Sequence, residues 1–239
     1  MKKLKKTAVL LTVLALALSL SACGESELAG TWEGRLDMSQ QAAARTEAAL
    51  EGFAPAGDTE SGTPELKDCL GGFSFGYTIV FSEDGSFSAG ADEEELASCL
   101  ESLREGIKEY YRQRLFASLS RAAEEMGLAS GISGPEQLES LMGVSLDEAI
   151  SEVLGVDLEE LAELALAELR AGLSGLELEG SYESGDGELV LYAGPDAGSA
   201  EAARLSYALE GDRLSLRAPG AGYLFGLEGL SSLELSRAS

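Results

Sequence analysis

The chain has 239 residues, with 42 acidic and 17 basic side chains, a formal net charge of −25 and no histidine. So negative a surface repels nucleic acid and anionic lipid headgroups, which argues against DNA, RNA and peripheral membrane binding. The lack of histidine excludes zinc sites and serine-protease chemistry, and we expect no enzyme, cofactor or dedicated metal site. We interpret the acids as a solvated face; binding of a cationic partner or of loosely held divalent ions is the alternative.

The first 24 residues have the layout of a secretory signal peptide. Four lysines within the first six residues precede an apolar run, Thr7–Leu20, that is shorter than a membrane-spanning helix requires. The run leads into Leu20-Ser21-Ala22-Cys23-Gly24, which resembles the lipobox of bacterial lipoproteins. This resemblance implies cleavage between Ala22 and Cys23 and a diacylglycerol thioether on Cys23.

We therefore expect a signal peptide over residues 1–22 and a lipidated tether over residues 23–29. Two acyl chains hold a protein firmly on a bilayer, whereas one chain holds it reversibly. The protein is then anchored by Cys23 to the cell membrane, on its extracytoplasmic face. Plain secretion and an uncleaved anchor are the alternatives.

The mature chain begins with a strand pattern and then a helical one. Residues 30–38 alternate apolar and polar side chains, which predicts a first strand. Residues 39–52 are rich in alanine and predict a helix. Residues 54–64 contain two prolines and turn-forming residues and predict a surface loop.

A β-hairpin is predicted over residues 73–91, where aromatic and aliphatic side chains recur at every second position. Its tight turn is Glu83-Asp84-Gly85-Ser86, which contains the favoured Asp-Gly pair.

From residue 92 on, apolar residues recur at helical spacing. Asp92 can cap a long helix whose first turn carries three glutamates. Residues 127–134 interrupt the pattern, and shorter helices are predicted from Pro135, Ser145 and Asp157.

After residue 175 the period returns to two, with acidic-glycine turns inside two further hairpins. The predicted strands are 176–183, 188–193, 204–210, 213–218 and 233–237.

About eight antiparallel strands favour a closed barrel, in a mostly β fold with added helices. We expect one domain over residues 30–239, with a helical insertion over residues 92–175 that lies between two hairpins and covers one barrel mouth. An open sheet packed on helices is the alternative.

A family resemblance supports the barrel. Leu28-Ala29-Gly30-Thr31-Trp32 is similar to the G-x-W signature that opens the first strand of lipocalins. The resemblance implies that Gly30 and Trp32 close the barrel bottom and that Arg237 packs across the indole, as a cation–π pair. The long helical insertion departs from lipocalins, and their second and third signatures are not evident. The order of elements also resembles small lipoproteins of Gram-positive bacteria.

Two functions follow as hypotheses for this non-catalytic lipoprotein. The first is binding of a small apolar molecule or a lipid in the barrel or under the helices. Its candidate lining is Phe73, Phe75, Tyr77, Tyr110 and Tyr111. We favour the simpler interpretation that these side chains fill the interior. The second hypothesis is a structural or protein-interaction module of the cell envelope, using the acidic helices.

Three cysteines are present. If Cys23 carries lipid, Cys69 and Cys99 form an even pair in an exported protein, and a disulfide between them would stabilise by about 3 kcal/mol. Two unpaired core cysteines are the alternative.

Overall fold

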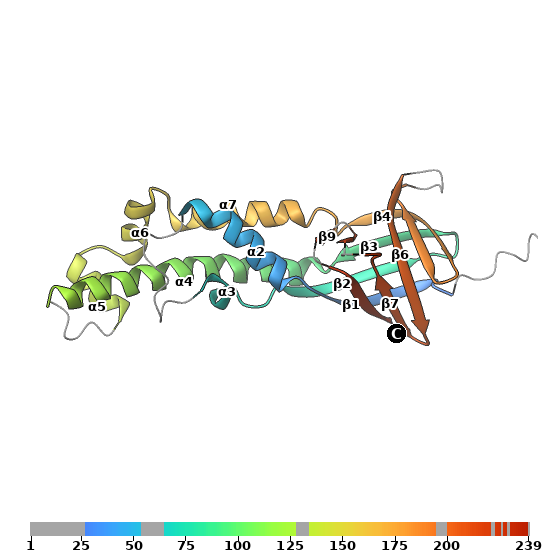
Figure 1. The fold of residues 1–239 in the computed structure, drawn as a ribbon, viewed down its shortest axis with the longest axis horizontal. Coiled ribbons are helices and arrows are strands. Elements are labelled where there is room, and N and C mark those ends of the chain that lie inside the picture. Colours follow the sequence, from blue (N-terminus) through green and yellow to red (C-terminus); the bar gives the residue numbers. More distant parts are fainter. Residues whose placement is uncertain are drawn as a thin grey trace, which may run out of the picture.

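A closed β-barrel and a rod of helices make up the protein (Figure 1). The computed structural model describes residues 27–53, 65–127, 134–194, 200–220, 223–225, 227–228 and 230–238. The predicted signal peptide, Cys23 and the predicted loop over residues 54–64 lie outside them.

Eight strands close the barrel, which confirms the predicted architecture over the open sheet. Each strand pairs antiparallel with the next along the chain, and the last closes against the first with Arg237 opposite Trp32. The strands are β1 Gly30–Asp37, β2 Ser74–Phe81, β3 Ser86–Ala91, β4 Leu178–Gly185, β5 Glu188–Tyr192, β6 Glu201–Glu210, β7 Arg213–Arg217 and β10 Ser232–Arg237. A separate ribbon, not predicted, consists of β8 Tyr223–Leu224 and β9 Leu227–Glu228.

The helices begin where their caps predict. Asp92 accepts a hydrogen bond from the Glu95 amide at 2.9 Å, and Ser145 forms a reciprocal capping box with Glu148. The helices are α2 Ser39–Leu50, the 3-10 turn η1 Glu51–Phe53, α3 Leu66–Cys69, α4 Glu93–Glu125, α5 Pro135–Met142, α6 Leu146–Leu154 and α7 Leu158–Gly172.

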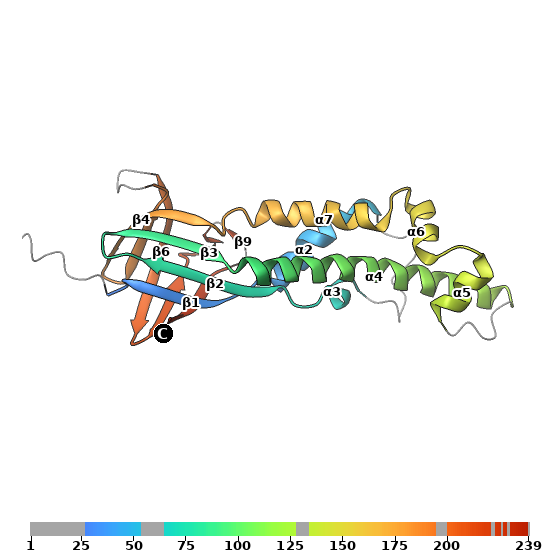
Figure 2. The same ribbon diagram turned by 180° about the vertical axis from the view of Figure 1, so that it is seen from behind.

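All of these helices lie on one side of the barrel and form what we call the rod (Figures 1 and 2). The insertion over residues 92–175 supplies α4 to α7, while α2 and α3 come from the connection between β1 and β2. The insertion does not lie across the barrel mouth as a lid. Instead α4 continues away from β3 for 33 residues, about 50 Å at 1.5 Å per residue.

Short segments close the mouth beside the rod. The Tyr77 hydroxyl donates to the Leu176 carbonyl at 2.9 Å, and the Phe225 ring lies 5.7 Å from the Tyr77 ring, between centroids. The α7–β4 connection and the β8–β9 ribbon therefore cover the side chains at this end. One continuous apolar core then runs from the barrel into the rod.

Candidate functional site: a groove along the β3–β4 seam

Gly30, Trp32 and Arg237 meet at the barrel end away from the rod. Trp32 is fully buried, and its indole N–H donates to the Leu28 carbonyl at 2.7 Å. The Arg237 guanidinium lies 4.3 Å from the indole centroid and donates to the Ala29 carbonyl at 2.7 Å. A Cβ at Gly30 would lie 2.6 Å from this guanidinium, so the arginine needs a glycine there. This arrangement closes the barrel and engages the indole and the guanidinium in structural contacts.

The five residues proposed as a ligand lining do not come together. Phe75 and Tyr77 point into the barrel from β2, and Phe73 packs edge-on against Phe75 with ring centroids 5.6 Å apart. Tyr110 and Tyr111 lie on α4, about 25 Å from its first turn. The five candidate residues therefore do not form one lining.

Packing accounts for these aromatic rings. Phe73, Phe75, Tyr77 and Tyr111 are each at most 2% exposed within the continuous apolar core. The Tyr111 hydroxyl donates to the Phe53 carbonyl at 3.2 Å, which joins α4 to η1. Burial raises the pKa of Tyr77, so its hydroxyl stays protonated and keeps its hydrogen bond to the Leu176 carbonyl.

Cys69 and Cys99 are free thiols, so the predicted disulfide is absent. The Cys69 carbonyl packs on Gly106, seven residues after Cys99 and about 10 Å farther along α4. The Cys99 thiol instead donates to the Ser74 carbonyl at 3.4 Å. Burial raises the pKa of the Cys69 thiol, as do Glu109 and Asp68 nearby, which lowers its reactivity.

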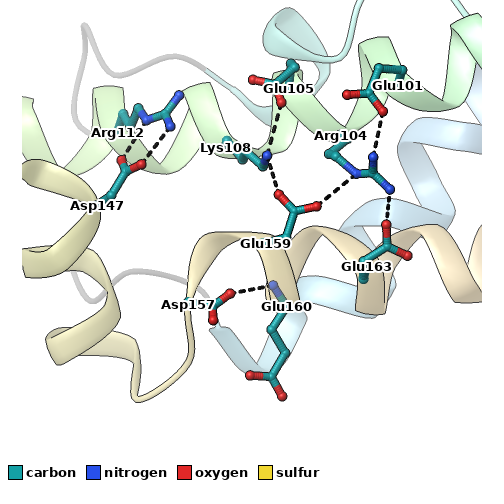
Figure 3. Close-up of polar contacts among 10 residues, drawn as sticks. All are labelled: Glu101, Arg104, Glu105, Lys108, Arg112, Asp147, Asp157, Glu159, Glu160 and Glu163. Atoms are coloured by element: carbon teal, nitrogen blue, oxygen red, sulfur yellow. Dashed lines mark hydrogen bonds and ion pairs between the residues drawn. The ribbon is translucent and has the colours of Figure 1, made fainter.

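Ion pairs join α4 to α7 along the rod (Figure 3). Arg104 contacts Glu163 and lies 3.3 Å from Glu159. Lys108 lies between Glu159, at 2.5 Å, and Glu105, at 3.0 Å. Exposed pairs contribute little singly, but a network that shares Glu159 resists separation of the two helices.

A second contact ties α4 to α6 (Figure 3). Arg112 donates two hydrogen bonds to the Asp147 carboxylate, at 2.7 and 2.8 Å. The Arg112 guanidinium holds the pKa of Asp147 below its ordinary value. The pKa of Glu163 is lowered in the same way by Arg170 and Arg104. Carboxylates between the helices are thus matched by cations, and this cluster braces the rod.

The ladder between β3 and β4 ends beside the rod. β3 pairs with β4 only from Ser86 to Ala89, whereas Gly90 and Ala91 pair with β2 and have no partner in β4. The ladder ends there because β4, which follows α7, begins at Leu178, opposite Ala89.

Three neighbouring hollows lie along this seam, with volumes of about 740, 500 and 300 Å³. The largest shares Ser88 and Glu179 with the hollow at the β2–β3 turn. It shares Ala91, Glu93 and Glu177 with the hollow between α4 and α7. We call these three hollows together the seam groove.

The lining of the seam groove mixes apolar side chains with carboxylates. Its lining includes Val80, Ala89, Ala91 and Leu178 beside the strands, and Leu96, Leu100, Leu173 and Leu176 between the helices. Glu93, Glu177 and Glu179 line the part beside the strands. Within the described part of the chain, no ion pair or hydrogen bond engages the side chains of these three glutamates. Arg170 lines the hollow between α4 and α7 together with Glu93 and Glu177.

Sequence reasoning missed the seam groove. The run Ser88-Ala89-Gly90-Ala91 belongs to the predicted hairpin, and its lack of large side chains is the available signal. Which strand faces such a run depends on the closure of the barrel, so the glutamates at positions 177 and 179 could not be placed beside it.

Comparisons with protein-family models, with curated proteins and with solved structures give no match. Among the residues that the structure describes, no group of three or more acidic or cysteine side chains is arranged to hold a metal ion. In the same residues, no helix is both long and apolar enough to cross a membrane.

Proposed function

We propose that this protein is a non-catalytic interaction module of the cell envelope, held on the extracytoplasmic face of the membrane through lipid on Cys23. One observation carries the proposal. The first described residues, Glu27 and Leu28, adjoin the closed barrel end, and the rod extends from the opposite end (Figure 1). A short lipidated tether would then keep the barrel near the bilayer and direct the rod outward.

Two features favour an interaction module over a carrier of a small apolar ligand. The aromatic side chains of the barrel are buried against one another, with Phe81 and Tyr182 at a centroid distance of 4.8 Å in edge contact. The rod is braced by cross-helix ion pairs, which suits a surface that must keep its shape while a partner binds.

Membrane attachment is tested by fractionating cells that express the full chain or its Cys23→Ala variant. We expect the wild type in the membrane fraction, with the mass of a diacylated Cys23 N-terminus, and the variant outside it. Ser21→Ala is the matched control and should stay in the membrane fraction. Equal membrane association of wild type and Cys23→Ala would contradict the anchor.

The interaction role is tested by photo-crosslinking in the native cells, with a photoreactive residue at Leu164 on α7 or at Ala202 on β6. Both positions are exposed. A discrete adduct from the rod position alone supports the module. Native mass spectrometry with lipid extraction checks the competing function: a stoichiometric apolar molecule in the purified protein would favour the carrier instead.

A further inference from the structure

We propose that the β8–β9 ribbon is a displaceable plug, which keeps a latent pocket for a small apolar molecule closed inside the barrel mouth. The inference goes beyond the proposed function and concerns the barrel rather than the anchor or the rod. It rests on three observations: small residues in the barrel wall, a ring that fills the space beside them, and the backbone conformation that places this ring.

The barrel wall leaves room beside Tyr77. Tyr77 points inward from β2, and its ladder partners are Gly34 on β1 and Ala91 on β3. Residues that are directly opposite in a ladder lie on the same face of the sheet, so both partners face the interior. Two residues before Ala91, Ala89 faces inward as well, opposite the buried Ile79. The wall therefore contributes little side-chain volume around Tyr77.

The ribbon supplies a side chain that fills this space. The Phe225 ring lies against Tyr77, with 5.7 Å between the ring centroids, and is 4% exposed. Leu224 and Leu227, which flank the turn of the ribbon, are buried too. Protein interiors are closely packed, so removal of this ring would leave an apolar pocket at the barrel mouth. Apolar cavities of this size stay dry and take up small aromatic molecules.

The turn of the ribbon is strained at Phe225. Leu224 pairs with Leu227, so Phe225 is the first of two turn residues, and its φ is +54°. Turns of this length favour Asn, Asp or Gly there, and the β4–β5 turn follows that rule with Asp186 at φ +52°. A bulky side chain in the left-handed region is unfavourable, and such strain is concentrated at ligand clamps and switches. Displacement of the ribbon would relieve it.

The ribbon stands apart from the ladders of the barrel. It forms a two-stranded sheet of its own, whose described ladder covers two residue pairs. Its turn rests on the α7–β4 connection, where a Cβ at Gly175 would lie 2.7 Å from the Phe225 carbonyl oxygen. Movement of the ribbon would therefore break side-chain packing and leave the eight-stranded barrel intact.

The pocket is tested by melting the full chain with and without toluene, a neutral molecule the size of the Phe225 ring. A ligand that binds only the folded protein raises the melting temperature. At a toluene concentration that raises the melting temperature of Phe225→Ala by about 3 °C, we expect a shift at least about threefold smaller for the wild type. Phe225→Leu keeps most of the apolar volume and should respond like the wild type.

A second variant shifts the ribbon without removing a side chain. Gly175→Ala places a methyl group against the Phe225 carbonyl, so the ribbon must move and toluene should raise the melting temperature of this variant too. Gly72→Ala is the matched control, because a Cβ at Gly72 would meet no atom within 4 Å. It should respond to toluene like the wild type.

Hydrogen exchange tests whether the ribbon moves in the wild type. The Leu224 amide donates to the Leu230 carbonyl at 2.9 Å within the ribbon segment, whereas β2 is paired on both sides in the barrel. We expect peptides that cover residues 223–230 to exchange about tenfold faster than peptides that cover residues 74–81.

Equal protection of these two segments would mean that the ribbon is a fixed part of the core and would overturn the inference. Lack of a toluene shift in both Phe225→Ala and Gly175→Ala would exclude the pocket. An equal shift in the wild type would exclude the plug. These measurements depend neither on lipid at Cys23 nor on a partner of the rod, so failure of the proposed function would leave them unchanged.

Discussion

Arg237 covers one face of the Trp32 indole at the point where β10 closes the barrel against β1. The two residues are also ladder partners, so a single register holds the cation 4.3 Å from the ring centroid. The residues just before β1 supply the backbone acceptors. The Leu28 carbonyl accepts from the indole N–H, and the Ala29 carbonyl accepts from the guanidinium. Closure of the barrel is therefore concentrated in one pair of side chains and the tripeptide before β1.

Truncating these two side chains should have unequal effects on stability. Trp32→Ala removes the largest buried side chain at this end and should lower the free energy of unfolding by about 3–5 kcal/mol. Arg237→Ala should cost about 1 kcal/mol beyond its lost hydrogen bonds, because the cation–π contact is partly exposed. Urea denaturation measures both. A loss below about 1 kcal/mol for Trp32→Ala would refute its role in closure.

Thr46 offers a stabilising substitution. Its side chain is fully buried on α2, and its hydroxyl has no hydrogen-bond partner. Thr46→Val keeps the shape and removes the unpaired polar group, so we expect a gain of about 1 kcal/mol. Thr46→Ser is the control: it keeps the hydroxyl, loses a buried methyl group and should destabilise. Thermal melting distinguishes the pair, and a loss of stability in Thr46→Val would contradict the assignment.

Gly106→Ala should destabilise the protein, contrary to what helix propensity predicts. Alanine in place of glycine inside a helix ordinarily stabilises by about 1 kcal/mol. Here a Cβ would overlap the Cys69 carbonyl and crowd Leu70, both backbone contacts of α3 on α4. We therefore expect Gly106→Ala to destabilise by about 1–3 kcal/mol, measured by urea denaturation. A more stable variant would mean that α3 does not pack there.

Acid should weaken the rod through its ion pairs. The pKa of Asp147 is lowered by Arg112 in the folded protein. A lowered folded-state pKa gives stability that is present above the ordinary carboxyl value of about 4 and is lost as the pH falls through the folded value. Melting temperatures from neutral pH down to about pH 2.5 should therefore fall more steeply for the wild type than for Arg112→Gln with Asp147→Asn. Parallel curves would exclude a contribution from this pair.

Cys69 and Cys99 should remain thiols. Mass mapping of alkylated peptides from a non-reduced, denatured sample is expected to find Cys69 and Cys99 each modified, since both are free and lie in separate contacts. Addition of a reductant should leave the melting temperature unchanged. A linked peptide that contains both residues would contradict the packing of α3 on Gly106.

Much of the barrel was predictable because its signals are local. The Asp-Gly turn at Asp84 and the alternation from Phe73 to Phe81 specify a hairpin without reference to the rest of the chain. Helix starts at Asp92, Ser145 and Asp157 are equally local, since each cap bonds an amide three residues ahead.

What sequence reasoning misplaced depends on contacts between distant segments. The apolar stripe that contains Tyr111 shows which face of α4 is buried but not that η1 covers it. The interval between Cys69 and Cys99 says nothing about their distance in space. The β8–β9 ribbon has two-residue strands, too short for any periodicity, and only the barrel mouth gives its apolar residues a place to pack.

The described chain passes between barrel and rod four times, at β1, β2, β3 and β4, and these four strands are neighbours in the barrel. A domain on one linker can swivel about a few backbone bonds, but a rod joined by four adjacent strands cannot turn without shearing their ladders. A pull on the rod is therefore shared among four backbone connections. The torsional stiffness that results fixes the direction of the rod relative to the barrel.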